Sequence, residues 1–318
     1  MRLTVCRLAG RYVNAIGLAN GHGGRHLGCE NNLNVLTQSD FMNNSRVGLK
    51  WHSLIEESVT GRQDQALHGV VQNSRNLCSA VSTVLREDDQ NELLVIGGDH
   101  SCAIGTWSGV ASTFRPYGDI GLIWVDAHMD AHTIESSPTK NIHGTPVAHL
   151  LGFGNELLRT VGDIYPKIKP QNLCLVGIRS FESEEQELLN RLGIRVFYDS
   201  EVQRRGIDEC MNEAVELVSR DTHGFGMSID LDGFRIKDAP AVGTPEPGGI
   251  VASEFLDYLR DNQLNGLLAT EIVEFMPHKD DLWKRSERLV TDLIEAVYLP
   301  KVSAQLEEPV NEQRQSAA

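Results

Sequence analysis

The segment GLIWVDAHMDAHT, residues 121–133, changes character at its midpoint. Its apolar first part is typical of a buried strand, whereas Asp126, His128, Asp130 and His132 follow at alternate positions. Burying carboxylates at the end of such a strand is costly unless another charge compensates them. We therefore expect a cation beside this segment.

Similar apolar runs recur along the chain and alternate with amphipathic stretches. Buried strands are expected at residues 93–97, 120–125, 173–178, 194–198, 224–229 and 267–275. Helical periodicity with exposed charges predicts helices at residues 69–87, 183–191, 208–220, 252–262 and 281–298. This alternation predicts a three-layer α/β fold, in which a mostly parallel sheet is flanked by helices on both faces.

No internal repeat, low-complexity linker or change of composition divides the 318 residues. We expect one domain at residues 1–306 and a polar tail at residues 307–318. The Gly- and Asn-rich segment 17–34 is expected to form a loop, and the sequence assigns it no role.

The composition argues against several classes of partner. A formal net charge of −15 disfavours binding to nucleic acid or to an anionic membrane surface. The chain has no run of about 18 apolar residues and no apolar secretory signal, which favours a cytoplasmic protein. Its cysteines contain no CxxC pair, so we expect reduced and mostly buried thiols at Cys6, Cys29, Cys78, Cys102, Cys174 and Cys210.

Possible metal ligands follow three of the expected strands. Alternate residues of an extended segment share a face, and the carboxyl ends of parallel strands meet at one edge of the sheet. The side chains expected to meet there as ligands are His100, Asp126, His128, Asp130, Asp230 and Asp232. For Asp99, a helix cap is the favoured interpretation.

The expected ligand set indicates which metal it suits. Two histidines and four aspartates are too many for one tetrahedral zinc ion, and the mostly oxygen donors suit a harder ion such as Mn²⁺. Two divalent cations would cancel the four negative charges. The sequence therefore predicts a site for two metal ions.

The motifs GGDHS at 97–101, DAHMD at 126–130 and SIDLDG at 228–233 resemble the metal-binding motifs of the ureohydrolases, the arginase and agmatinase family. The resemblance spans residues 90–300 and implies an α/β fold with a binuclear manganese site. Carried over by position, it implies one ion held by His100, Asp126, Asp130 and Asp230. It implies a second ion held by His128, Asp126, Asp230 and Asp232, with Asp126 and Asp230 bridging.

The same resemblance implies a mechanism. A hydroxide shared by two ions attacks the guanidinium carbon of the substrate, and Asp130 orients it and accepts a proton. His143, in HGTPV, corresponds to the histidine that carries a proton to the leaving amine. Glu274, in EIVEFMP, corresponds to the glutamate that pairs with the guanidinium. Without the resemblance, His143 would be interpreted as a plain loop residue.

The segment between Asp130 and His143 favours L-arginine as the substrate. Its twelve residues equal the spacing in arginases, whereas agmatinases typically have a shorter segment. By position, Thr139 and Asn141 correspond to the residues that bind the α-carboxylate, and His132 stands where arginases have asparagine. The further expected substrate contacts are Glu182, in place of an aspartate that receives the α-amino group, and Thr244.

Alternatives remain open. An agmatinase or another guanidino-compound hydrolase is the first, because GIRS followed by Glu184 and Glu185 is similar to agmatinase-like relatives. Arg235 and Ile236 stand where arginases have Asp-Pro, which affects positioning around the metal ligands. The complete ligand set disfavours a single-zinc deacetylase and a metal-free binding protein. The family usually forms trimers or hexamers, so a homo-oligomer is expected.

Overall fold

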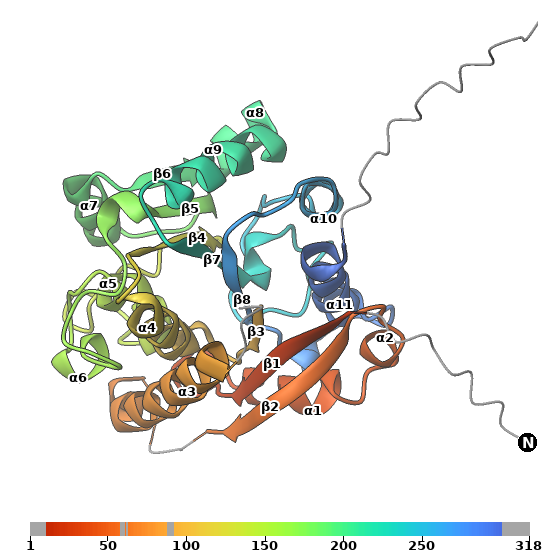
Figure 1. Cartoon of the computed structure of the whole chain (residues 1–318), viewed down its shortest axis with the longest axis horizontal. Coiled ribbons are helices and arrows are strands. Elements are labelled where there is room, and N and C mark those ends of the chain that lie inside the picture. Colours follow the sequence, from red (N-terminus) through yellow and green to blue (C-terminus); the bar gives the residue numbers. More distant parts are fainter. Residues whose placement is uncertain (1–10, 58–60, 62, 88–91, 301–318) are drawn as a thin grey trace, which may run out of the picture.

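The computed structural model describes residues 11–57, 61, 63–87 and 92–300. Cys6 and the predicted polar tail lie outside these residues. One sheet runs through the described part of the chain, and all of its strands are parallel in the order β2-β1-β3-β8-β7-β4-β5-β6 (Figure 1). The strands are β1 (Tyr12–Ala19), β2 (Gly48–Glu56), β3 (Leu93–Ile96), β4 (Ile120–Val125), β5 (Leu173–Ile178), β6 (Arg195–Tyr198), β7 (Gly224–Asp230) and β8 (Leu267–Val273).

Helices connect the strands, as a parallel sheet requires. They are α1 (Asn32–Leu36), α2 (Asp40–Asn43), α3 (Leu67–Glu87), α4 (Ala103–Phe114), α5 (Pro146–Leu150), α6 (Glu156–Arg159), α7 (Ser183–Leu192), α8 (Asp199–Arg205), α9 (Ile207–Ser219), α10 (Ala252–Asp261) and α11 (Arg285–Tyr298). The five predicted helices are confirmed, and only α11 starts clearly later than expected. Its start is fixed by Asp280, whose carboxylate accepts the backbone N–H groups of Ser286 and Glu287.

Alternating side chains of the strands pack into two core layers. On β3, Leu93 and Val95 pack with buried side chains of α3 and α4. Leu94 and Ile96 point to the other face and pack with those of α9, α10 and α11. Figure 1 shows these two sets of helices on opposite sides of the sheet. The predicted three-layer α/β fold is therefore confirmed.

The first two strands were not predicted. In β1, Asn14 and Gly17 interrupt the apolar pattern, and β2 is an edge strand whose residues alternate between exposed and half-buried. The expected loop at 17–34 is partly wrong, because it includes the end of β1 and most of α1. A side chain at Gly17 would collide with Leu33, so glycine allows α1 to pack against β1.

Strands β3, β8, β7 and β4 are neighbours at the centre of the sheet. Each of them leads into one of the segments that carry the predicted ligands and catalytic groups. Crevices at the carboxyl ends of such strands are the usual binding sites of parallel sheets. Among the described residues, no helix is both long and apolar enough to cross a membrane.

Candidate active site

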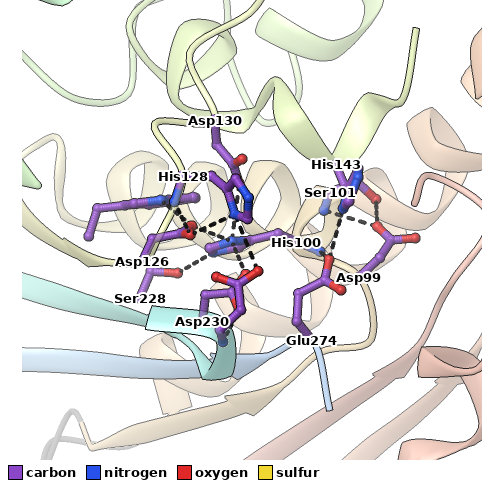
Figure 2. Close-up of polar contacts among 12 residues, drawn as sticks. Asp99, His100, Ser101, Asp126, His128, Asp130, His143, Ser228, Asp230 and Glu274 are labelled. Atoms are coloured by element: carbon purple, nitrogen blue, oxygen red, sulfur yellow. Dashed lines mark hydrogen bonds and ion pairs between the residues drawn. The ribbon is translucent and has the colours of Figure 1, made fainter. Parts of the chain in front are cut away.

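The carboxyl ends of the central strands bring the six predicted metal ligands together, and all of them except Asp232 are labelled in Figure 2. They form two groups that could each hold an ion, namely His100, Asp126 and Asp230, and Asp126, His128 and Asp232. Asp126 is common to both groups, as expected of a bridging ligand. Asp130 approaches the first group, with Oδ2 at 3.2 Å from His100 Nδ1.

The first group is centred on His100. Its Nδ1 atom lies 3.2 Å from Asp126 Oδ2 and 3.1 Å from Asp230 Oδ2. In the second group, His128 Nδ1 lies 3.2 Å from Asp232 Oδ2 and 3.5 Å from Asp126 Oδ1. Asp126 thus offers a different oxygen to each group. Asp230 was also expected to bridge, and its second oxygen accepts the backbone N–H of Asp232.

The chemistry of His100 fits a metal ligand. Its Nε2 lies 3.0 Å from the hydroxyl of Ser228, which itself donates to Glu271. Because the Ser228 hydrogen is used on Glu271, its oxygen accepts the Nε2 hydrogen of His100. In the neutral form of the ring, which is the form that binds a metal, Nδ1 then carries the lone pair; this atom is fully buried and has no hydrogen-bond partner among the described residues. A lone pair that faces three carboxylates is suited to a cation.

The electrostatics of the aspartates support the same conclusion. Burial raises the pKa of Asp230 well above its usual value, and repulsion from Asp232 and Asp126 adds to this rise. Burial and the charge of Asp126 also raise the pKa of Asp130, to about 6. Such carboxylates are compensated poorly by the protein itself, and two divalent cations between them would remove the repulsion.

Two carboxylates of the site are held in an unusual backbone conformation. Asp130 and Glu274 have φ angles of 48° and 63°, in the left-handed region that non-glycine residues rarely adopt. Surrounding contacts hold both residues, since Val147 N–H donates to the Asp130 carbonyl and Glu274 N–H donates to Gly98. Strain of this kind is concentrated at functional sites.

His143 and Glu274 form a buried pair beside the metal ligands. His143 Nδ1 lies 3.0 Å from Glu274 Oε1, which also accepts the backbone N–H of His100. Burial opposes protonation of His143, but Glu274 raises its pKa to about 9. The second oxygen, Oε2, is contacted by the thiol of Cys29 at 3.5 Å. The predicted proton carrier and guanidinium partner are therefore neighbours.

The residues expected to contact the substrate outside its guanidinium group differ in their hydrogen-bond partners. Both ring nitrogens of His132 are engaged, Nδ1 with Ser136 Oγ at 3.0 Å and Nε2 with Glu182 Oε2 at 3.1 Å. Asn141 is 5% exposed, and its Oδ1 atom has no hydrogen-bond partner within the part of the chain that the structure describes. Thr244 donates its hydroxyl hydrogen to Asp232, so it contacts a predicted metal ligand.

A cavity of about 230 Å³ joins these residues into one site. Of the predicted residues, it is lined by His128, Asp130, His132, Thr139, Asn141, His143, Glu182, Asp230, Asp232, Thr244 and Glu274. Arg25, Ser137, Ser180, Glu185 and Glu246 also line it, and none of them had been predicted as a site residue. Arg25 comes from the Gly-rich segment, to which the sequence had assigned no role.

Ser228 and Glu271 lie behind the site and were also missed. The two residues are paired in the register of β7 and β8. Glu271 is fully buried and accepts hydrogen bonds from Ser228, Thr106 and Trp107. A single carboxylate inside an apolar strand sequence, and a serine two positions before Asp230, were the signals that could have revealed them.

An all-parallel sheet whose carboxyl end gathers histidine and aspartate side chains defines an α/β protein with two groups of residues that could hold metal ions. Known proteins agree with this description. The sequence model of the arginase family matches residues 32–299. An arginase from Bacillus caldovelox is 39% identical over 218 residues, which cover 68% of this chain and 71% of that protein. An arginase from Entamoeba histolytica is 33% identical over 83% of this chain and 90% of its own length.

Solved structures extend the likeness to the fold. The native arginase of Bacillus caldovelox superimposes with a TM-score of 0.83 at 31% identity, over 92% of this chain and 99% of that one. The chain belongs to the arginase family. The resemblance seen in the three motifs is thereby confirmed.

Proposed function

We propose that this chain hydrolyses L-arginine to L-ornithine and urea at the carboxyl ends of β3, β4, β7 and β8. One observation carries the proposal: in a chain of the arginase family, six histidine and aspartate side chains converge next to the buried His143–Glu274 pair. Relatives named arginase, matched over more than two thirds of the chain, support arginine as the substrate.

The proposed cofactor is a pair of Mn²⁺ ions. His100, Asp126, Asp130 and Asp230 would hold one ion, and Asp126, His128, Asp230 and Asp232 would hold the other. The mostly oxygen donor set suits manganese. When bound, two such ions supply a water molecule whose pKa is lowered toward neutrality.

The chain's own residues would divide the remaining work. Asp130 lines the cavity, and its carboxylate can orient a reacting water and accept its proton. His143 has Nδ1 engaged with Glu274, which leaves Nε2 as the nitrogen that can give a proton to the leaving amine. Among the described residues, Glu274 Oε2 has only a thiol as donor, so it can accept an N–H of the substrate guanidinium.

Agmatine, which is arginine without its carboxylate, remains the second candidate substrate. The observation that favours it is the state of His132, because neither ring nitrogen is left to receive a carboxylate. Against it stand the relatives named arginase and the length of the segment between Asp130 and His143. We therefore keep L-arginine as the proposed substrate.

Urea release by the manganese-loaded protein tests the proposal. The ratio of kcat/KM for L-arginine to that for agmatine is expected to exceed about 10²-fold, because a site that hydrogen-bonds a substrate group rejects analogues without it. Equal or better hydrolysis of agmatine would leave only the family assignment. About two manganese ions per chain are expected by elemental analysis.

The role of His143 has its own test. His143→Gln is expected to keep the metal content and to lose about 10²–10⁴-fold in kcat, the usual contribution of a positioned acid or base. His68→Gln is the control, because His68 is exposed on α3. An unchanged kcat in the His143 variant removes this residue from the mechanism.

A homo-oligomer, either a trimer or a hexamer, and a cytoplasmic location complete the proposal. Both rest on the family resemblance and the composition. Sedimentation velocity of the metal-loaded protein measures the assembly, and a monomer at micromolar concentration would contradict it.

A further inference from the structure

The Gly-rich segment forms one wall of the active site. Gly23 N–H donates to Asp99 Oδ2 at 2.9 Å, and the Gly23 carbonyl accepts the backbone N–H of His143 at 3.1 Å. Asn20 adds further contacts, because its side chain donates to Asp99 Oδ1 and accepts the N–H of Gly98, and its carbonyl accepts the N–H of Asp99. The segment is therefore hydrogen-bonded both to the turn that carries His100 and to His143, the proposed proton carrier.

The close approach of this wall depends on its glycines. A Cβ atom at Gly23 would lie 2.8 Å from Ser101 Oγ, closer than real Cβ contacts. At the outer end, Glu57 accepts the N–H groups of Gly21 and His22. Both ends of the turn are thus held, and the residue that follows it, Arg25, lines the cavity.

Arg25 brings an unusual charge to the cavity. It is the only lysine or arginine among the eighteen residues of the described chain that line this space, and seven of the others are acidic. The proposed metal ions would compensate the inner aspartates. Glu182 and Glu246 do not belong to the ligand set, and their negative charges would repel the α-carboxylate of arginine.

The described residues predicted to bind the α-carboxylate include no lysine or arginine. His132 is engaged with Ser136 and Glu182, and Thr139 and Asn141 are neutral. Hydrogen bonds that join two charged groups are roughly twice as strong as neutral ones, and guanidinium and carboxylate groups match in a two-pronged geometry. A carboxylate in this cavity would therefore gain most from Arg25.

We propose that Arg25 recognises the α-carboxylate of the substrate and thereby selects L-arginine over its decarboxylated analogue. The inference rests on the proposed function. It gives the Gly-rich segment two tasks, which are holding His143 through Gly23 and placing Arg25 at the cavity. L-Ornithine keeps the carboxylate, so the product would use the same contact.

The test compares ligands that differ only in the carboxylate. Arg25→Gln is expected to lower kcat/KM for L-arginine by about tenfold, mainly through KM, because a contact retained throughout the reaction contributes uniform binding. The Ki of L-ornithine as a competitive inhibitor should rise by a similar factor. Agmatine turnover and the Ki of putrescine should change by less than about twofold.

Two further variants separate recognition from structure. Arg25→Lys keeps the charge and should restore KM for L-arginine to within about threefold of the wild type. Arg220→Gln is the matched control, because Arg220 is an exposed arginine that pairs with Glu216 on the outside of α9. A purely structural role of Arg25 would instead lower kcat for both substrates, because the same segment holds His143.

The outcomes are distinguishable. Equal losses with and without the carboxylate, or an unchanged KM for L-arginine in Arg25→Gln, overturn the inference while leaving the proposed function intact. Absence of urea release from L-arginine by the wild type overturns the proposed function, and the inference fails with it. A loss confined to carboxylate-bearing ligands, with rescue by lysine, supports both.

Discussion

Glu271 on β8 and Asp230 on the neighbouring strand β7 are both buried carboxylates, yet their surroundings differ. Glu271 accepts hydrogen bonds from Thr106, Trp107 and Ser228, all of them neutral donors. Asp230 accepts the N–H of Asp232, and its other oxygen faces the lone-pair nitrogen of His100. Neutral donors can satisfy one buried carboxylate, whereas carboxylates that are crowded around one histidine repel one another and are suited to a cation.

The difference shows how the two regions cooperate. Through Ser228, Glu271 fixes the hydrogen of His100 on Nε2, which leaves Nδ1 for a metal ion. The ring of His100 also stacks on Trp124 at a centroid distance of 4.1 Å. Glu271, which is satisfied by neutral donors, thus orients His100, which belongs to the group that could hold a cation.

The largest effect is expected for Asp230→Asn. Loss of a shared ligand should lower urea release by on the order of 10³-fold and reduce the manganese content below that of the wild type. After the metal has been removed by a chelator, however, the variant should have a higher free energy of unfolding than the wild type. Because the pKa of Asp230 is raised in the folded protein, its ionised form destabilises that state at neutral pH, and asparagine removes this cost.

Urea unfolding with and without manganese measures this reversal. Manganese at one hundred times its Kd should stabilise the wild type by about 2.7 kcal/mol for one site, and the variant by much less. The chelated variant should be at least as stable as the chelated wild type. A chelated variant of lower stability would show that Asp230 is satisfied by the protein alone, like Glu271.

A smaller effect is expected for Glu271→Gln. Glutamine replaces the charged acceptor with one neutral amide oxygen that has to serve Ser228, Trp107 and Thr106, so the Ser228 hydroxyl holds the His100 hydrogen less firmly. Manganese affinity should fall by about 10–100-fold, as for other residues that orient metal ligands. Competition with a fluorescent chelator measures this affinity.

The matched control is Glu287→Gln. Glu287 is also a buried glutamate, but it accepts from Ser39 and Lys284 at the start of α11 rather than from a residue bound to a metal ligand. Its replacement should destabilise folding and leave manganese affinity unchanged. If both variants bind manganese as the wild type does, Glu271 has no part in orienting His100.

Prediction from the sequence was most successful for features that depend on a short stretch of residues, such as a buried strand or a group of closely spaced ligands. Apolar runs revealed six of the strands, and the spacing of Asp126, His128 and Asp130 indicated that they share a site. Strand β1 is also mostly buried, but Asn14 and Gly17 interrupt its apolar run, so it was missed. The edge strand β2 alternates polar and apolar residues, so it has no such run. Contacts between distant segments were beyond this reasoning, since 43 positions separate Glu271 from Ser228, and Arg25 lies 118 positions before His143.

Substrate contacts were the least predictable part of the site. The resemblance to arginases placed His132 at the α-carboxylate of the substrate. In the structure, both of its ring nitrogens are hydrogen-bonded to neighbouring residues, Ser136 and Glu182. Thr244 was expected to contact substrate, and its hydroxyl donates to Asp232. A side chain's partner depends on packing that a motif does not encode.

The smallest effect concerns a buried histidine that, like Glu271, is satisfied by neutral partners. His149 on α5 has Nδ1 at 2.8 Å from the Thr145 carbonyl, and its Nε2 accepts the backbone N–H of Asn155 at 3.1 Å. Burial lowers its pKa to about 4. The folded pKa lies below the ordinary value of about 6.5, so between these values the unfolded chain binds more protons and stability falls as the solution is acidified.

From pH 7 to pH 5, this residue should remove about 2 kcal/mol of unfolding free energy. His149→Gln does not titrate, and its amide oxygen can still accept the Asn155 N–H. The variant should therefore lose less stability than the wild type over this interval, whatever its stability at pH 7. His68→Gln, on the exposed side of α3, serves again as the control in urea unfolding at both pH values. Parallel losses in wild type and His149→Gln would mean that the folded and unfolded chains bind a proton at His149 equally well, and that neutral partners do not hold it uncharged.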